Sequence, residues 1–317
     1  MVHMMVDEDL NFSSIFIMRK GLLMKQIVKK IYRDYIRFTE YKKNNILTGV
    51  EGNSLIYNSI KKGKPLMVTR IGSTELEVLS KYVYKKRFTE DLKNKVNLLS
   101  GVYPPTDELL KTFSETFLDS LKDADIIGVW FNKNEGEIIN KYCKKVELTE
   151  LRALEPYYWD KPWSKALENK TVLVIHPFEQ SIIQQFAKRE KLFVNEDVLP
   201  NFNLRTIKAV QSAGGNLVEF ESWVEALNYM YGEIDKIEFD IAIIGAGAYG
   251  LPLASYIKRK GKQAVHMGGA SQILFGIKGV RWDNHPVISK LYNEYWIRPD
   301  DKEKPRAFNK IENGCYW

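Results

Sequence analysis

One stretch near the end of the chain, Phe239–Asp283, limits the fold more than any other. It begins with an apolar run, 241–244, continues with Gly245-Ala-Gly-Ala-Tyr-Gly250, and then follows a helical pattern that ends at Gly261. A second apolar run, 263–267, comes directly afterwards. Strand, glycine turn, helix and strand make one βαβ unit, and such a unit belongs in a parallel sheet covered by helices.

Glycine follows both strands of this unit. Gly245, Gly247 and Gly250 would let a ligand approach the backbone at a helix start, where free N–H groups and the positive dipole end attract anions. The second strand ends in His266-Met-Gly268-Gly269. The sequence leaves three interpretations open: a dinucleotide site, close packing of strand against helix, and a mononucleotide or nucleotide-sugar site. We favour the third, because the second strand lacks the acidic residue that would hold a dinucleotide's ribose.

Polar residues also follow the strand expected at 64–72, in the run Arg70-Ile-Gly72-Ser73-Thr-Glu75. A guanidinium can hold a diphosphate by paired hydrogen bonds. A carboxylate can bind a divalent cation or act as a base. The alternative is that Arg70 and Glu75 form an ion pair with each other.

Two further segments supply candidate site residues. The strand expected at 170–175 ends in His176, and Glu179 begins the next helix. His176 is either a general base, a phosphate partner or a structural histidine. Arg281 and Asp283 lie in the glycine-rich loop that follows the βαβ unit, where they add a second cation and another candidate base.

Strands that alternate with helices predict an α/β protein. We expect a Rossmann-like, doubly wound, mostly parallel sheet with helices on both faces, and an N-terminal helical extension. The predicted divisions are a leader and basic helix (1–45), a catalytic domain (46–290) and an aromatic tail packed on that domain (291–317). Residues 148–163 are aromatic without a clear period and predict a loop or lid beside a cleft.

Composition excludes several classes of protein. The chain has 317 residues, 44% of them hydrophobic and 27% charged, as in ordinary globular proteins. Two cysteines without metal-ligand spacing fit a reducing cytoplasm. A net charge of +7 suits anionic partners, but no nucleic-acid motif accompanies it. The sequence has no apolar run long enough to span a membrane, and its acidic N-terminus predicts no export signal.

The segment Arg19–Lys43 predicts a basic amphipathic helix, with Met24, Ile27, Val28, Ile31, Tyr35 and Phe38 on one face. One interpretation is peripheral contact with an anionic membrane, where a lipid-linked acceptor would be found. The other is a packing or homodimerisation helix, which the sequence alone favours.

These motifs resemble a known family. Val68–Glu75 resembles the Arg-(Phe/Ile)-Gly-Asp-Gly-Glu stretch of bacterial glycosyltransferases with the GT-D fold, found in surface-polysaccharide clusters. The stretch from Gly245 through Gly268-Gly269 to Trp282 resembles their C-terminal half, so the resemblance spans residues 60–285. In that family an Asp-x-Glu motif binds Mn²⁺ beside the donor diphosphate. The matching residues here are Ser73-Thr74-Glu75, in which Ser replaces Asp.

The resemblance implies a cytoplasmic glycosyltransferase that moves a sugar from a nucleotide-sugar donor to a glycan or lipid-linked acceptor, at the inner face of the membrane in the lipid-linked case. Mn²⁺ or Mg²⁺ at Glu75 is one expectation. The other is that Arg70, Arg281 or a lysine carries part of the diphosphate charge instead of a cation, because one carboxylate is a poorer cation site than two. The alternatives are an NAD(P)- or FAD-dependent oxidoreductase and a non-catalytic envelope-assembly protein. The candidate catalytic residues are Glu75, His176 and Asp283, and the candidate nucleotide-sugar contacts are Arg70, Gly72, Ser73, Gly245, Gly247, Tyr249, Gly250, His266, Gly268, Gly269 and Arg281.

Overall fold

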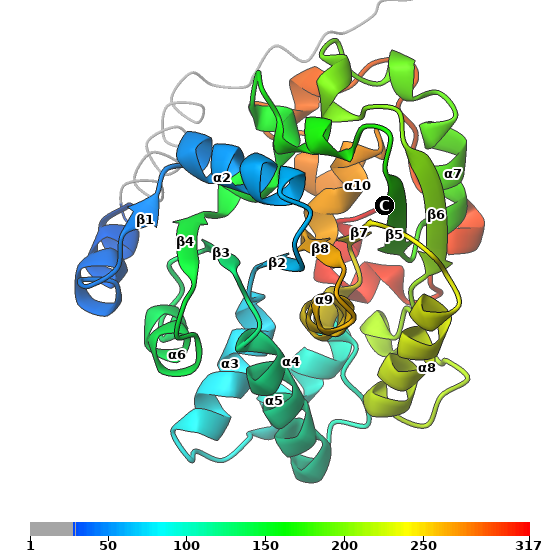
Figure 1. Ribbon diagram of the computed structural model, residues 1–317. Helices are drawn as coiled ribbons and strands as arrows, with labels where there is room; N and C mark the ends of the chain where they lie inside the picture. Colours follow the sequence, from blue (N-terminus) through cyan, green and yellow to red (C-terminus); the bar gives the residue numbers. More distant parts are fainter. Residues whose placement is uncertain (1–27, 29) are drawn as a thin grey trace, which may run out of the picture.

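The computed structural model describes residues 28 and 30–317, and within them all strands belong to one eight-stranded parallel sheet (Figure 1). The order across the sheet is β1-β4-β3-β2-β8-β7-β5-β6. The strands are β1 (Ile46–Leu47), β2 (Leu66–Thr69), β3 (Ile126–Val129), β4 (Glu147–Glu150), β5 (Thr171–His176), β6 (Asn203–Lys208), β7 (Ile241–Ile244) and β8 (Gln263–His266). The prediction of an α/β fold with a parallel sheet is confirmed.

Helices cover both faces of the sheet, as expected for a doubly wound fold (Figure 1). One face packs against α3 (Ser73–Val83), α4 (Glu90–Ser100), α5 (Asp107–Leu121), α6 (Glu135–Tyr142), α8 (Trp223–Asp235) and α9 (Gly250–Arg259). The other packs against α2 (Gly49–Lys61), α7 (Glu179–Phe186), α10 (Ser271–Leu274) and residues of the C-terminal tail.

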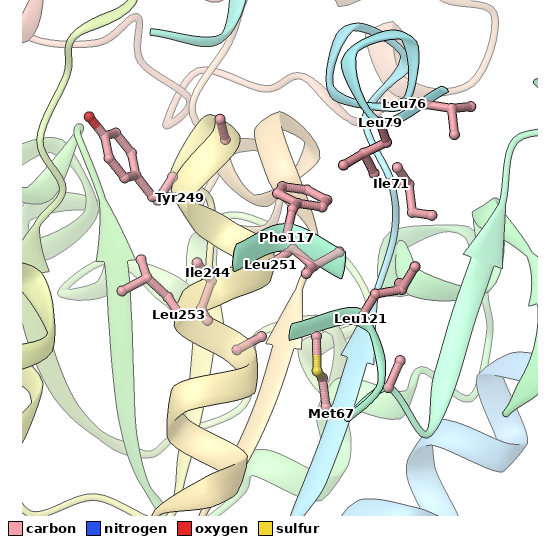
Figure 2. Packing of buried hydrophobic residues seen from close by; sticks show 14 of the residues in the cluster. Met67, Ile71, Leu76, Leu79, Phe117, Leu121, Ile244, Tyr249, Leu251 and Leu253 are labelled. Carbon is pink, nitrogen blue, oxygen red and sulfur yellow. The ribbon is translucent and has the colours of Figure 1, made fainter. Parts of the chain in front are cut away.

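The central strands are buried on both faces, and their side chains alternate between two hydrophobic clusters. In β2, Met67 points into the cluster beneath α5 and α9, whereas Leu66 and Val68 join the cluster on the opposite face. Figure 2 shows the first cluster, in which Met67 and Ile244 of the sheet lie with helix residues such as Phe117. Continuous apolar runs therefore became central strands because each face of the sheet takes every second residue.

Two edge elements were not predicted. β1 is two residues long, and β4 has exposed glutamates at both ends, Glu147 and Glu150. β1 pairs in parallel with β4, and β4 pairs in parallel with β3. Residues 148–150 of β4 fall at the start of the segment that the sequence predicted as a loop or lid, so that prediction is wrong for them.

An N-terminal helix, described at 28 and 30–40, lies beside β1 at one end of the sheet (Figure 1). The Glu40 carboxylate accepts hydrogen bonds from the backbone N–H groups of Asn134 (2.7 Å) and Gly136 (3.0 Å) at the start of α6. Burial of Ile36 adds an apolar anchor. Residues 19–27 of the predicted Arg19–Lys43 helix lie outside the described residues.

Candidate active site

A cavity of about 820 Å³ lies at the carboxyl ends of the central strands. The segments that follow β2, β5, β7 and β8 all line it, and these four strands are neighbours in the sheet. The chain leaves β2 and β7 toward one face and β5 and β8 toward the other. Such reversals open a crevice at the sheet edge, which is the usual ligand site of this architecture.

Arg70 lines this cavity directly after β2, with its guanidinium over the ring of Trp130 at 4.8 Å. Its Nε is buried and has no hydrogen-bond partner. Among the described residues no ion pair joins Arg70 to Glu75, so the alternative of a simple Arg70–Glu75 pair is wrong. A buried N–H without a partner is costly, and an anionic ligand in the cavity would relieve that cost.

The turn after Arg70 brings Gly72, Ser73 and Glu75 to the cavity wall. A Cβ on Gly72 would lie 1.9 Å from Glu75 Oε2 and 3.2 Å from Arg70 Nη2. A side chain at this position would therefore displace the Glu75 carboxylate from its place in the turn. Glu75, in the first turn of α3, is 7% exposed.

The glycines of the turn 245–250 pack closely, line the cavity or, at Gly245, do both, since a Cβ on Gly245 would lie 2.0 Å from Ser271 Oγ. A Cβ on Gly250 would lie 2.3 Å from the ring of His266, so this glycine permits close packing of α9 on β8 and does not line the cavity. Gly245 and Gly247 do line it. Gly247 has φ +52°, and the nearest atom to a Cβ there would be 3.9 Å away, so packing does not explain this glycine.

His266 and the second glycine turn, Gly268-Gly269, lie at the end of β8 beside Arg70. His266 is buried, its Nδ1 is 2.9 Å from Thr69 Oγ1, and it does not line the cavity. Burial, and then the Arg70 charge, hold the pKa of His266 well below its usual value. A Cβ on Gly268 would lie 3.0 Å from Arg70 Nε, whereas Gly269 lines the cavity beside Tyr316.

His176 lines the cavity, but its hydrogen bond does not suit a base. Its Nδ1 accepts the backbone N–H of Phe178 at 2.9 Å, which leaves the proton of the neutral ring on Nε2. Burial lowers the pKa of His176 to about 3. The side chain is therefore equipped to donate a hydrogen bond from Nε2.

Arg281 and Asp283 are both engaged in ion pairs. Arg281 lines the cavity, pairs with Glu312, and stacks on Tyr316 at 4.7 Å. Asp283 pairs with Arg298 at 2.7 Å and is not brought to the cavity. Glu179 is not brought there either.

Tyr249 lines the cavity, but its hydroxyl is already hydrogen-bonded within the protein. Ser212 Oγ donates to the carbonyl of Gly101 (2.7 Å), so the Tyr249 hydroxyl donates to Ser212 Oγ (2.8 Å). The ring stacks on Trp223 at 5.5 Å. These contacts clamp the turn 211–213 against the start of α9.

Sequence reasoning missed Glu155. It lines the cavity from the segment predicted as a lid, and its Oε2 accepts a hydrogen bond from Tyr157 at 3.0 Å. Burial raises the pKa of Glu155 to about 7, although the charges of Arg152 and Arg70 oppose that rise. The only signal in the sequence was its place in an aromatic stretch beside an expected cleft.

The donor set does not fit a metal centre built by the protein alone. In the described part of the chain, no three His, Cys, Asp or Glu side chains are grouped to hold a metal ion. The Asp-x-Glu position supplies one carboxylate, Glu75, and two hydroxyls. Divalent cations of this kind prefer several carboxylate oxygens, so no step is assigned to a cation here.

A model of one protein family matches most of the chain. The model of the GT-D fold-like domain matches residues 51–274. No curated protein matches. Two solved structures of domain of unknown function 1792, one described as having a distinct glycosyltransferase fold, are each 12% identical, with TM-scores of 0.43 and 0.46, and the alignments cover 84% of this chain and 94% of theirs. A third, a new glycosyltransferase from Streptococcus sanguinis, is 10% identical with a TM-score of 0.44, covering 86% of this chain and 100% of that one.

The family match covers well over half of the chain and includes the turns after β2, β5, β7 and β8. The chain therefore belongs to the GT-D-like family and is, by that membership, a glycosyltransferase.

Proposed function

We propose that the protein transfers a sugar from a nucleotide-sugar donor to a hydroxyl group of a glycan or lipid-linked acceptor. The observation that supports this most is Arg70, a cavity-lining cation with a buried, unpartnered Nε and no carboxylate partner among the described residues. A donor diphosphate offers the two negative groups that such a guanidinium binds best.

In this proposal the diphosphate lies between Arg70 and the turn of Gly245 and Gly247, with His176 Nε2 as a further donor. Negative charge grows on the leaving diphosphate in the transition state. Fixed donors there lower the barrier without having to reorganise. Arg281 contributes less, because Glu312 already neutralises it.

We assign the acceptor's proton to Glu155 instead of His176 or Asp283. In a single displacement, the acceptor oxygen forms a bond to the anomeric carbon and its proton passes to the Glu155 carboxylate. The bond from that carbon to the diphosphate breaks, and its electron pair leaves with the nucleoside diphosphate. A base works best when its pKa lies near the operating pH, and the pKa of Glu155 is about 7.

The location of the enzyme, its biosynthetic role and its oligomeric state are also part of the proposal. We expect a cytoplasmic enzyme of cell-surface polysaccharide biosynthesis, and a homodimer stays a prediction. In the described residues, no helix is both long and apolar enough to cross a membrane. The oxidoreductase alternative is not favoured, since β8 ends without an acidic residue for ribose. The family match does not favour the non-catalytic alternative.

A donor screen tests the proposal directly. Purified protein is incubated with UDP-, GDP-, CDP- and TDP-sugars, and released nucleoside diphosphate is measured, with a thermal-shift series of the diphosphates and NAD in parallel. We expect one diphosphate to raise the melting temperature and its sugar to be consumed. Stabilisation by NAD alone would overturn the proposal.

A further inference from the structure

The N-terminal helix presents an apolar face that nothing in the described chain covers. Tyr35 is 61% exposed and Phe38 is 70% exposed, and Val28, Ile31 and Tyr32 are exposed beside them. At helical spacing these side chains share one side of the helix, and the buried Ile36 borders that side one turn after Tyr32. The sequence favoured a packing or homodimerisation helix; the helix packs on the domain through Ile36, but this apolar face does not pack within the described residues.

The helix is held firmly with this face outward. Glu40 caps α6 through two backbone N–H groups, and the hydroxyl of Tyr41 donates to Glu135 at 3.0 Å. Arg33 lies over the ring of Phe131 at 5.4 Å. These contacts fix the inner side of the helix and leave the apolar side free to meet a partner.

The charge of the whole chain is concentrated in this segment. Residues 19–43 contain nine Lys or Arg and two Asp or Glu, a net charge of +7, which equals the net charge of all 317 residues. The rest of the chain is therefore neutral overall. In the described part, Lys30, Arg37, Lys42 and Lys43 form no ion pair.

We propose that this helix docks the protein on an anionic membrane surface. An interfacial helix of this kind buries its apolar face at the headgroup boundary, while flanking lysines and arginines attract anionic lipid. Tyrosines such as Tyr32 and Tyr35 suit that boundary. A second copy of the chain fits less well, because a symmetric contact would bring the same basic side chains of both copies together.

Docking would also place the cavity near the lipid, since Arg33 of this helix lines the cavity. Delivery of a lipid-linked acceptor to that cavity rests on the proposed function. The membrane contact itself does not.

The test is co-sedimentation of the full chain with vesicles of phosphatidylcholine alone and of phosphatidylcholine with phosphatidylglycerol. We expect binding to the anionic vesicles only, weakened by salt. Lys30→Glu with Arg37→Glu should lower binding at least about tenfold. The matched control, Arg205→Glu with Lys208→Glu on the opposite edge strand β6, makes the same charge change and should bind like the parent.

A second pair of variants tests the apolar face. Tyr35→Gln with Phe38→Gln should lose binding, whereas Val194→Gln with Leu217→Gln, which removes two exposed apolar side chains elsewhere, should not. Equal binding to both kinds of vesicle would overturn the proposal. So would absence of vesicle binding, whether the chain dimerises through this face or residues 1–27 cover it. Turnover on a water-soluble acceptor is measured in parallel, so that a failed transferase assay and failed docking are told apart.

Discussion

The chemistry of the site depends on which charged side chains are already satisfied. Arg281 forms an ion pair with Glu312, and Asp283 forms one with Arg298. Arg70, in contrast, faces the cavity with a buried, unpartnered Nε. The stack of Arg70 on Trp130 holds the guanidinium in place without neutralising it. A fixed cation without an ion-pair partner is what a diphosphate leaving group needs.

The proposed base gives a pH-dependent prediction. Below pH 7, Glu155 takes up a proton and can no longer accept one, so kcat/KM should fall about tenfold for each pH unit. Glu155→Gln should lower the rate about 10²- to 10⁴-fold and should remove this fall of kcat/KM at low pH. The measurement is the pH–rate profile of both proteins.

Glu168→Gln is the control for this variant, because Glu168 is an exposed glutamate that follows the same segment and does not line the cavity. It should keep the parent profile. If Glu155→Gln kept the same fall of kcat/KM below pH 7, another group would be the base.

Removal of divalent cations tests the role of Glu75. With one carboxylate at that position and Arg70 available, nucleoside diphosphate affinity should change less than about threefold after dialysis against EDTA. The measurement is titration calorimetry before and after dialysis. A loss of tenfold or more that Mn²⁺ restores in the parent but not in Glu75→Gln would contradict this.

Residues at the end of a strand or in the turn and first helical residues after it could be found from the sequence. Arg70, Glu75, His176 and Gly245 come after buried apolar runs, and parallel strands end at the same edge. Glu155 could not be found in this way, because the strand before it, β4, was not predicted and its approach to Arg70 depends on how the segment after β4 folds back. The ion pair between Asp283 and Arg298 is likewise a tertiary contact, and no local sequence pattern predicts it.

At the scale of elements, length and burial decided which strands could be predicted. β2, β5, β7 and β8 are apolar runs, and each appears where the sequence predicted a strand. β1 and β4 form the edge next to β3, with few apolar residues, so their pairing depends on neighbours far away in the sequence. The role of Gly250 also depends on two elements, since α9 approaches β8 at His266.

Gly250→Ala should therefore destabilise the protein by about 1–3 kcal/mol, because the added methyl group overlaps a buried ring. Chemical denaturation measures the change. Gly232→Ala in α8 is the control, since a Cβ there meets nothing within 4 Å, and it should raise stability by about 0.5–1 kcal/mol. If Gly250→Ala left stability unchanged but weakened nucleotide binding, this glycine would be a ligand contact instead of a packing residue.

At the scale of the whole molecule, the sheet brings distant segments to one edge. β2 belongs to the half of the chain that continues into β3 and β4, whereas β5, β7 and β8 come from the later half. Because β2 and β8 are neighbours, Arg70 and the glycine turn after β7 line the same cavity although 175 positions separate Arg70 from Gly245. The site therefore exists only in the complete sheet.

The central claim is that this shared edge binds the diphosphate of a donor through Arg70. Isothermal titration calorimetry of the parent, Arg70→Ala and Arg205→Ala with the nucleoside diphosphate found in the donor screen tests it most directly. We predict that Arg70→Ala weakens binding at least about thirtyfold, while the exposed control Arg205→Ala binds like the parent. Equal affinity in all three folded proteins would contradict the account.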